Sequence, residues 1–223
     1  MLYFISALLG ASAFAVQATA TSSDMYVFAY TFQPQFCYGE TSYPGCSSPQ
    51  EFWYTHFTVH GLWPQFKDGG YEHDCTSEAF DEEVTDAIGW GTMTTYWPDV
   101  KYAEDDPEYT EFWDHEWTKH GTCSGLSQFD YFNSTIAMIQ SFGTPSIYSD
   151  AVGSTIDAGD LRDAFGGAAY ASLQCDSGKY VNGVYTCWDM DSVTHLPTTQ
   201  IECPSDVQDE DTCTASTLEV TSF

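Results

Sequence analysis

The cysteines are the feature that most limits how this chain can fold. All eight lie after residue 20, behind an apolar N-terminal stretch. An even number of cysteines in that setting is typical of a disulfide framework, and the absence of any C-x-x-C pair disfavours a zinc site. Eight cysteines allow about 105 pairings, so the connectivity is open at this point. They are Cys37, Cys46, Cys75, Cys123, Cys175, Cys187, Cys203 and Cys213.

The N-terminal stretch, MLYFISALLGASAFAVQATA, carries no charged side chain and ends in Ala18-Thr19-Ala20. That ending is typical of a signal-peptidase site, although the usual positive region is missing. Polar residues interrupt the apolar run, which favours a secretory signal over a membrane anchor. We expect a signal peptide at 1–20 and a single domain at 21–223. The mature chain is then secreted and extracellular, or enters a vacuolar or lysosomal type of compartment, without a membrane partner.

The charge of the chain is strongly negative. Five basic residues oppose 33 carboxylates, which gives a formal net charge of −28 at neutral pH. Such a surface repels polyanions, so the composition disfavours a broad nucleic-acid-binding face. Solubility explains most of these carboxylates. Operation in acid, where carboxylates are protonated and histidines become charged, is the functional alternative.

Hydrophobic patterns predict an α+β fold. It is one domain in which a central, mainly antiparallel β-sheet packs against several α-helices and is held by disulfides. No internal repeat or linker marks a domain boundary. Strands are expected at 25–32, at 53–63 before Pro64, and within 179–190. Helices are expected behind a Ser77 N-cap as far as residue 88, and at 105–121, 127–142 and 157–165.

The stretch FWDHEWTKHGTC, residues 112–123, concentrates polar and titratable residues. His115 and His120 are five positions apart, which on a helix separates them by roughly 140°. This excludes the H-E-x-x-H arrangement of zinc proteases. Glu116 and His120, four apart, share a face with Lys119 nearby. The cluster suits proton transfer and stabilisation of an anionic transition state. A helix that buries Trp113 and Trp117 and exposes its polar residues is the open alternative.

A second stretch, FTVHGLWPQF at 57–66, places His60 at the end of a buried-looking strand. Two histidine segments in one chain suggest a paired acid and base. Together these stretches resemble the two active-site segments of the ribonuclease T2 family of secreted acid endoribonucleases. YTFQPQFC (30–37), YWP (96–98), CWD (187–189) and ECP (202–204) also resemble landmarks of that family. The resemblance covers nearly the whole mature chain.

The resemblance implies a role for each residue of the two segments. His60 matches the general acid for the leaving 5′-oxygen, and His120 matches the general base on the ribose 2′-hydroxyl. Glu116 and Lys119 match residues that stabilise the phosphorane, and His115 matches a histidine that holds the phosphate. The implied reaction is cleavage of single-stranded RNA by transphosphorylation to a 2′,3′-cyclic phosphate, followed by slower hydrolysis. It needs no metal or other cofactor, and the enzyme is expected to be a monomer working below about pH 6.5.

The resemblance also implies a base-binding site. Trp63 and Tyr71 match positions that line a stacking pocket, although Tyr71 could equally be an ordinary loop aromatic. Gln65 stands where many fungal relatives carry Asp, so the base preference can differ from theirs. His56, His73 and His195 receive no catalytic role.

The family further implies a Cys75–Cys123 disulfide. Pairs Cys37–Cys46, Cys187–Cys203 and Cys175–Cys213 are the expected remainder. Asn133 starts the only N-glycosylation sequon, inside a predicted helix.

Two other classes of function compete with the ribonuclease. A secreted glycosidase would use a carboxylate pair in place of the histidines. A non-enzymatic interaction protein would retain the fold without catalysis, and the intact histidine segments argue against it.

Overall fold

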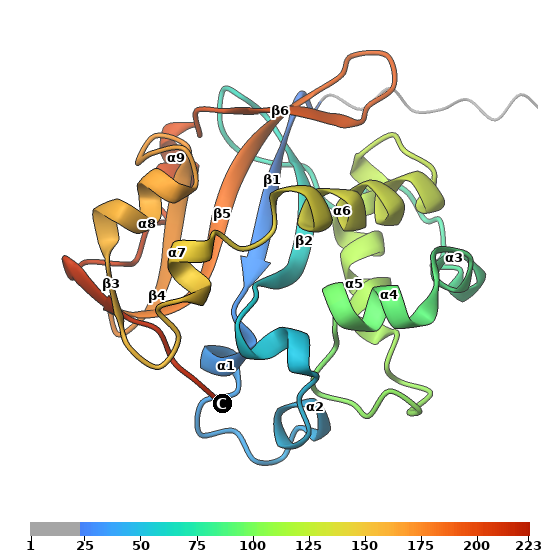
Figure 1. Cartoon of the computed structure of the whole chain (residues 1–223). Coiled ribbons are helices and arrows are strands. Elements are labelled where there is room, and N and C mark those ends of the chain that lie inside the picture. Colours follow the sequence, from blue (N-terminus) through green and yellow to red (C-terminus); the bar gives the residue numbers. More distant parts are fainter. Residues whose placement is uncertain (1–22) are drawn as a thin grey trace, which may run out of the picture.

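The computed structural model describes residues 23–223, so the predicted signal peptide lies outside the described residues. In this part of the chain seven strands form one sheet, with the path β2-β1-β5-β7-β3 and with β4 and β6 also paired to β5 (Figure 1). The pairs are antiparallel except for β5 with β7. The strands are β1 (Met25–Thr31), β2 (Thr58–Gln65), β3 (Thr155–Asp157), β4 (Ala171–Asp176), β5 (Tyr180–Met190), β6 (Pro197–Ile201) and β7 (Thr217–Glu219).

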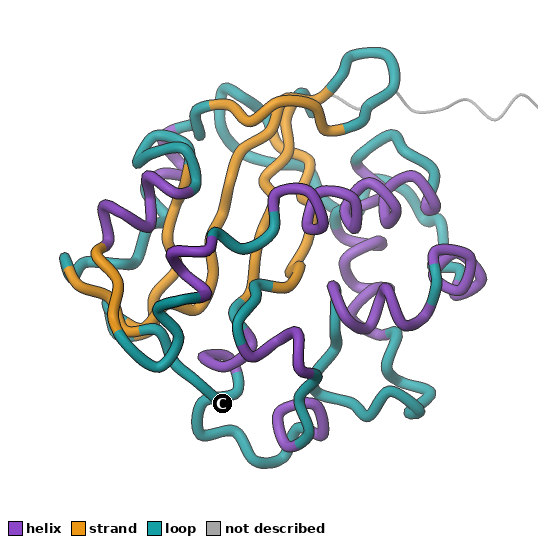
Figure 2. The backbone as a smooth tube through the Cα atoms, viewed as in Figure 1, coloured by secondary structure: helices purple, strands orange, loops and turns teal. Residues whose placement is uncertain are grey.

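The helices lie around this sheet, and the α+β prediction is confirmed. Figure 2 shows the strands in the centre, with the helices of residues 82–142 gathered beside β2. The longer helices are α3 (Glu82–Ile88), α4 (Trp90–Tyr96), α5 (Glu111–Lys119), α6 (Gln128–Phe142) and α8 (Ala158–Ala164). Short helices are α1 (Gln33–Phe36), α2 (Pro44–Ser47), α7 (Ser146–Ser149), α9 (Ser205–Gln208), and the 3₁₀ turns η1 (Glu51–Tyr54) and η2 (Gly121–Cys123).

The central strand β1 forms where an uninterrupted apolar run predicts it. Residues 25–30 are all buried between β2 and β5. The second strand was predicted too early, because η1 occupies 51–54 and β2 begins only at Thr58. It also continues through Pro64 to Gln65. A proline is tolerated there because β2 lies at the end of the sheet path.

Two helix boundaries also differ from the prediction. Asp81, not Ser77, caps α3, and its carboxylate accepts a hydrogen bond from the Glu83 N–H at 3.0 Å. Helix α5 begins at Glu111 instead of 105, because the preceding residues form turns. Helix α6 lies where a helix was predicted, and the Ser127 hydroxyl caps it by accepting a hydrogen bond from the Asp130 N–H. Strands β3, β4, β6 and β7 and helix α4 were not predicted.

An aromatic core holds α5 and α6 against β2. Trp113 and Trp117 are fully buried, as predicted, and the Trp117 ring meets Tyr131 edge to face at 5.6 Å. The Tyr131 hydroxyl donates to the Leu62 carbonyl at 2.9 Å. A buried hydroxyl of this kind fixes β2 relative to α6, because losing the bond would leave a polar group unsatisfied.

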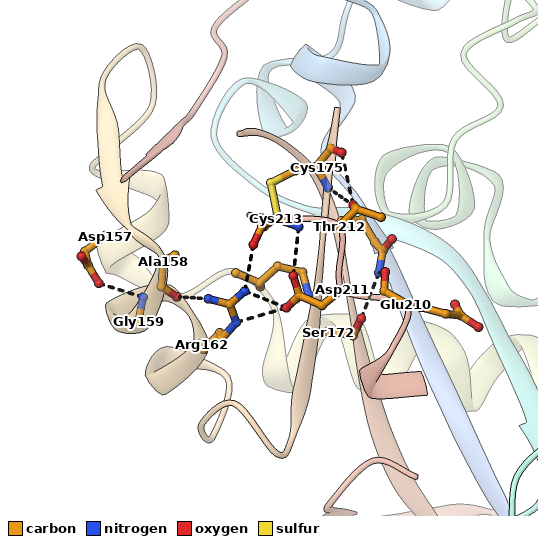
Figure 3. Close-up of polar contacts among 12 residues, drawn as sticks. Asp157, Ala158, Gly159, Arg162, Ser172, Cys175, Glu210, Asp211, Thr212 and Cys213 are labelled. Carbon is orange, nitrogen blue, oxygen red and sulfur yellow. Dashed lines mark hydrogen bonds and ion pairs between the residues drawn. A yellow bond between two sulfur atoms is a disulfide. The ribbon is translucent and has the colours of Figure 1, made fainter. Parts of the chain in front are cut away.

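Disulfides join distant segments, and all four expected pairs are present: Cys37–Cys46, Cys75–Cys123, Cys175–Cys213 and Cys187–Cys203. Figure 3 shows a polar cluster beside one of them. Arg162 of α8, the only arginine in the sequence, donates to the Asp211 carboxylate at 2.8 and 3.1 Å. Asp211 also accepts from the Leu173 and Cys213 N–H groups. This cluster ties α8 and β4 to the C-terminal segment.

Among residues 23–223, no helix combines the length and apolarity needed to cross a bilayer.

Candidate active site

His60 stands on β2 at the floor of a cleft. Its Nδ1 lies 3.3 Å from the Thr31 hydroxyl on the neighbouring strand β1. The side chain is 43% exposed, and its Nε2 lies 3.8 Å from the Glu116 carboxyl of α5. The ring edge also packs against Phe112, with 5.5 Å between centroids. The two histidine segments, far apart in sequence, therefore meet at His60 and Glu116.

Glu116 is buried beneath this cleft, with 1% of its surface exposed. Its Oε2 accepts a hydrogen bond from the Trp63 indole N–H at 2.9 Å. Gly61 makes this approach possible. A Cβ at that position would collide with Glu116 Oε2 and Trp63 Nε1. Gly61 was not predicted as a site residue, although it directly follows His60 in the sequence.

His120 lies at the C-terminal end of α5 and is 6% exposed. The Trp63 ring stacks on its imidazole, with 5.3 Å between centroids and 29° between planes. In the described part of the chain, Nδ1 of His120 has no hydrogen-bond partner. Trp63 thus contacts both Glu116 and His120, which supports the predicted shared face of α5.

His115 and Lys119 lie on the more exposed side of α5. His115 lines the same cleft as His60 and Glu116, together with Lys101 and Tyr102. A neighbouring depression contains His115 and Lys119, with carboxylates from Asp74 and Asp114. His115 is exposed whereas His120 is buried, as expected from their angular separation.

The loop before α3 is attached to the C-terminal end of α5. The Asp74 N–H donates to the Lys119 carbonyl at 2.9 Å, and the Cys75 N–H donates to the Thr122 hydroxyl at 3.2 Å. The Cys75–Cys123 disulfide joins the same two segments covalently. Tyr71 lies four residues upstream of Cys75, in the loop that these contacts attach to α5.

The base-site residues occupy different environments. Trp63 is half-buried between His120 and Tyr185, whose ring meets it edge to face at 5.2 Å. Gln65 is buried, whereas Tyr71 is exposed and lies beside His73. The exposed Tyr71 ring is therefore accessible to a base that stacks on it. Tyr185 was not predicted, because only the pairing of β5 with β1 brings it to the site.

Burial is the largest cause of the pKa shifts of His60, Glu116 and His120. It raises the pKa of Glu116 to about 8, which the Trp63 hydrogen bond and Lys119 oppose. Burial, followed by the charges of Lys119 and His115, lowers the pKa of His120 to about 3. Partial burial and the same two neighbours also lower the pKa of His60. Without an anion, the imidazoles of His60 and His120 and the carboxyl of Glu116 are therefore neutral at pH 6.

A side pocket adjoins the cleft at His60. It is lined by Gln33, Phe36, Val59, Asp99 and Phe112, among others. Among residues 23–223, no group of three or more His, Cys, Asp or Glu side chains is placed to hold a metal ion.

Comparison with known proteins agrees with this geometry. The profile described as "Ribonuclease T2 family" matches residues 23–203. The chain belongs to the ribonuclease T2 family. Among curated T2 relatives, it is 37% identical to intracellular ribonuclease LX of Solanum lycopersicum over 122 residues, or 53% of this chain and 48% of that one. The chain thus spans about half the length of the first curated relatives it matches.

A longer alignment relates the chain to extracellular ribonuclease LE of Solanum lycopersicum, at 28% identity over 90% of this chain and 89% of that one. Among solved T2-type structures, ribonuclease MC1 from bitter gourd seeds superposes with a TM-score of 0.66 at 26% identity, covering 88% of this chain and 99% of that one. Human RNase T2 shares the fold, with a TM-score of 0.62 at 24% identity, covering 82% and 91%.

Proposed function

We propose that this protein is a secreted, metal-independent endoribonuclease that cleaves single-stranded RNA through 2′,3′-cyclic phosphates, with an acidic pH optimum. The observation that carries the proposal is the meeting of His60 and Glu116, 3.8 Å apart, in a cleft that His115 also lines. The first step forms the bond from the ribose 2′-oxygen to phosphorus and breaks the bond from phosphorus to the 5′-oxygen.

His60 and His120 are the proton donor and acceptor of this step. His120 takes the proton from the 2′-hydroxyl, and His60 gives a proton to the leaving 5′-oxygen. In the second step water forms a bond to phosphorus, and the bond from phosphorus to the 2′-oxygen breaks. His60 takes the proton from the water and His120 returns a proton to the 2′-oxygen, so the two histidines exchange roles. In the free protein the imidazole of His120 is 6% exposed and the Trp63 ring stacks on it.

Glu116, Lys119 and His115 stabilise the phosphate. Because the pKa of Glu116 is raised to about 8, its carboxyl is protonated in acid and can donate a hydrogen bond to a phosphate oxygen. Lys119 and a protonated His115 contribute positive charge. A neutral carboxyl is more useful here than a carboxylate, which would repel the substrate.

The substrate phosphate is expected to charge the histidines. An anion within a few ångströms raises the pKa of an imidazole, and so opposes the burial that lowers the pKa of His60. His60 then acquires its proton at mildly acidic pH when RNA is bound. Acid also reduces the repulsion between RNA and the 33 acidic residues.

Secretion is part of the proposal. It depends on removal of residues 1–20 and on an oxidising compartment, with which the four disulfides agree. Asn133 is exposed on α6, so a glycan there would point into solvent. We propose a monomer that acts outside the cell or in a vacuolar or lysosomal type of compartment.

The test is cleavage of homopolymer RNAs at about pH 5 with EDTA present. We expect cyclic phosphate ends and a loss of at least about 100-fold in His60→Ala and His120→Ala. His195→Asn is the matched control, because His195 lies in the loop between β5 and β6 at φ 60°, which asparagine tolerates. No cleavage by oxidised protein across the acid range, or full activity in His120→Ala, would refute the mechanism.

A further inference from the structure

Two hollows of the surface meet at Phe36, the last residue of α1. The first is the side pocket, which reaches from Phe36 to the catalytic His60. The second lies on the other side of α1, between Phe36, Tyr38, Asp176, Tyr180 and Asn182. Because Phe36 lines both hollows, they adjoin at this side chain, and we call the line from His60 over Phe36 to Tyr180 the path. We call the second hollow the distal hollow.

Three of the seven residues that line the distal hollow are aromatic. Tyr38 is 75% exposed and Phe36 is 39% exposed. The ring of Tyr180 forms a further wall, and Lys179 Nζ lies 4.5 Å from its centroid. Exposed rings next to a lysine suit the binding of a single-stranded nucleic acid, because bases stack on the rings and the cation attracts a phosphate. The lysine is notable in a chain with only five basic residues.

The floor of the distal hollow is held rigidly. Asp176 accepts hydrogen bonds from the Gln35 amide at 2.8 Å and from the Asn182 amide at 3.2 Å. The Phe32 N–H donates to the Asn182 carbonyl, and the Cys37–Cys46 disulfide lies directly after α1. Binding to a preorganised surface loses less conformational entropy. The amide donors also occupy the Asp176 carboxylate, which lessens its repulsion of a nearby phosphate.

The position of His60 gives the direction of the path. In the proposed function, on which this inference rests, His60 protonates the leaving 5′-oxygen. The side pocket beside His60 therefore receives the first nucleoside on the 3′ side of the cleaved bond. The distal hollow lies one step farther from the reacting phosphate in the same direction.

We propose that Phe36, Tyr38 and Tyr180 form a stacking subsite for the second nucleotide on the 3′ side of the cleaved bond, with Lys179 beside its phosphate. The protein then prefers RNA chains that continue beyond the dinucleotide at their 3′ end. Extension at the 5′ end does not use this subsite.

The test compares a dinucleotide substrate with one extended by two nucleotides at its 3′ end and one extended equally at its 5′ end. We expect 3′ extension to raise kcat/KM by about 5- to 100-fold. In Tyr38→Ala this gain falls below about threefold, while dinucleotide cleavage and the effect of 5′ extension stay unchanged. Tyr38→Phe retains the gain. Phe129→Ala, which removes an exposed aromatic ring from α6, is the control and also retains the gain.

Binding distinguishes this inference from the catalytic proposal. The same oligonucleotides with 2′-deoxyribose at the cleaved position cannot form the cyclic phosphate, so their Kd reports binding alone. A 3′-extension gain in affinity that Tyr38→Ala removes would support the subsite even if no RNA were cleaved. Cleavage of the dinucleotide without any 3′-extension gain, or a gain that survives in Tyr38→Ala, would overturn it.

Discussion

Trp63 donates its indole N–H to the buried Oε2 of Glu116 at 2.9 Å, and thereby joins β2 to α5 at the centre of the site. The same ring stacks on His120. One side chain thus contacts two residues that lie one helical turn apart at the C-terminal half of α5. Its position between them predicts that Trp63 supports both the fold and the proposed site.

Trp63→Phe should retain a ring over His120 but remove the hydrogen bond to Glu116. We expect a loss of about 1–3 kcal/mol in the free energy of unfolding, because a buried polar group loses its partner. We also expect kcat to fall about 10- to 100-fold. Urea denaturation and dinucleotide kinetics measure the two effects. Trp90→Phe is the control, since the Trp90 ring packs on Tyr109 and Trp113 away from the cleft, and its activity should be unchanged.

Gly61→Ala should disrupt the site by sterics. The added Cβ would overlap Glu116 Oε2 and Trp63 Nε1, so one of the two must move. We expect a loss of at least about 100-fold in kcat and about 2–4 kcal/mol in stability. Gly91→Ala is the matched control on α4, where a Cβ meets no atom within 4 Å. Higher helix propensity should leave that variant equal to wild type or up to about 1 kcal/mol more stable. Equal activity in both variants would contradict the steric argument.

Glu116→Gln should change how stability depends on pH. The folded pKa of Glu116, about 8, is above its ordinary value of 4.5. The folded state therefore binds this proton more tightly, and the stabilisation is complete below pH 4.5 and disappears as the pH rises through 8. Glutamine does not ionise, so the stability of the variant relative to wild type should increase between pH 5 and 8. We expect an advantage on the order of 1–3 kcal/mol at pH 8, with catalysis strongly reduced.

His120→Asn should change the pH dependence of stability in the opposite direction. The pKa of His120 is lowered to about 3, so its contribution to stability is present above pH 6.5 and is lost as the pH falls toward 3. Melting temperatures of wild type and both variants from pH 3 to 8 would separate the two groups. A Glu116→Gln advantage that did not grow with pH would show that Glu116 is ionised in the free protein.

Removing the Cys75–Cys123 disulfide should affect activity more than removing Cys37–Cys46. The two bonds close loops with sequence separations of 48 and 9 residues. Chain entropy gives about 4 and about 3 kcal/mol for these loops, so the difference in stability is modest. The first bond, however, fixes the segment of Tyr71 and Asp74 to the end of α5. We expect about a tenfold loss of kcat/KM in Cys75→Ala/Cys123→Ala and less than threefold in Cys37→Ala/Cys46→Ala, measured at a temperature where both remain folded.

Binding of a 3′-nucleotide should take up protons at pH 5 to 6. The anion favours the charged forms of His60 and His115, whose pKa values are lowered in the free protein. Titration calorimetry in buffers of different ionisation enthalpy should show an uptake of about one proton, which His60→Ala reduces. An uptake that stayed the same in His60→Ala would place the titrating group elsewhere.

The sequence by itself determined the features that depend on residues close together in the chain. The apolar run of β1, the helix predicted at 127–142 and the helical spacing that places Glu116 and His120 on one face are all local patterns, and the structure contains them. The two histidine segments also identified the family. The predicted N-cap of α3 was wrong, because both Ser77 and Asp81 are suitable capping residues and the packing of the surrounding chain selects Asp81.

Only the tertiary structure decided how β2 and α5 meet. The 3.8 Å approach of His60 to Glu116, the need for a glycine at 61 and the double contact of Trp63 all join residues about 50 positions apart. Periodicity cannot encode such contacts, since they depend on how Tyr131 and the tryptophans pack α5 and α6 against the sheet. The path from His60 to Tyr180 arises in the same way, from β1, α1 and β5 packing side by side.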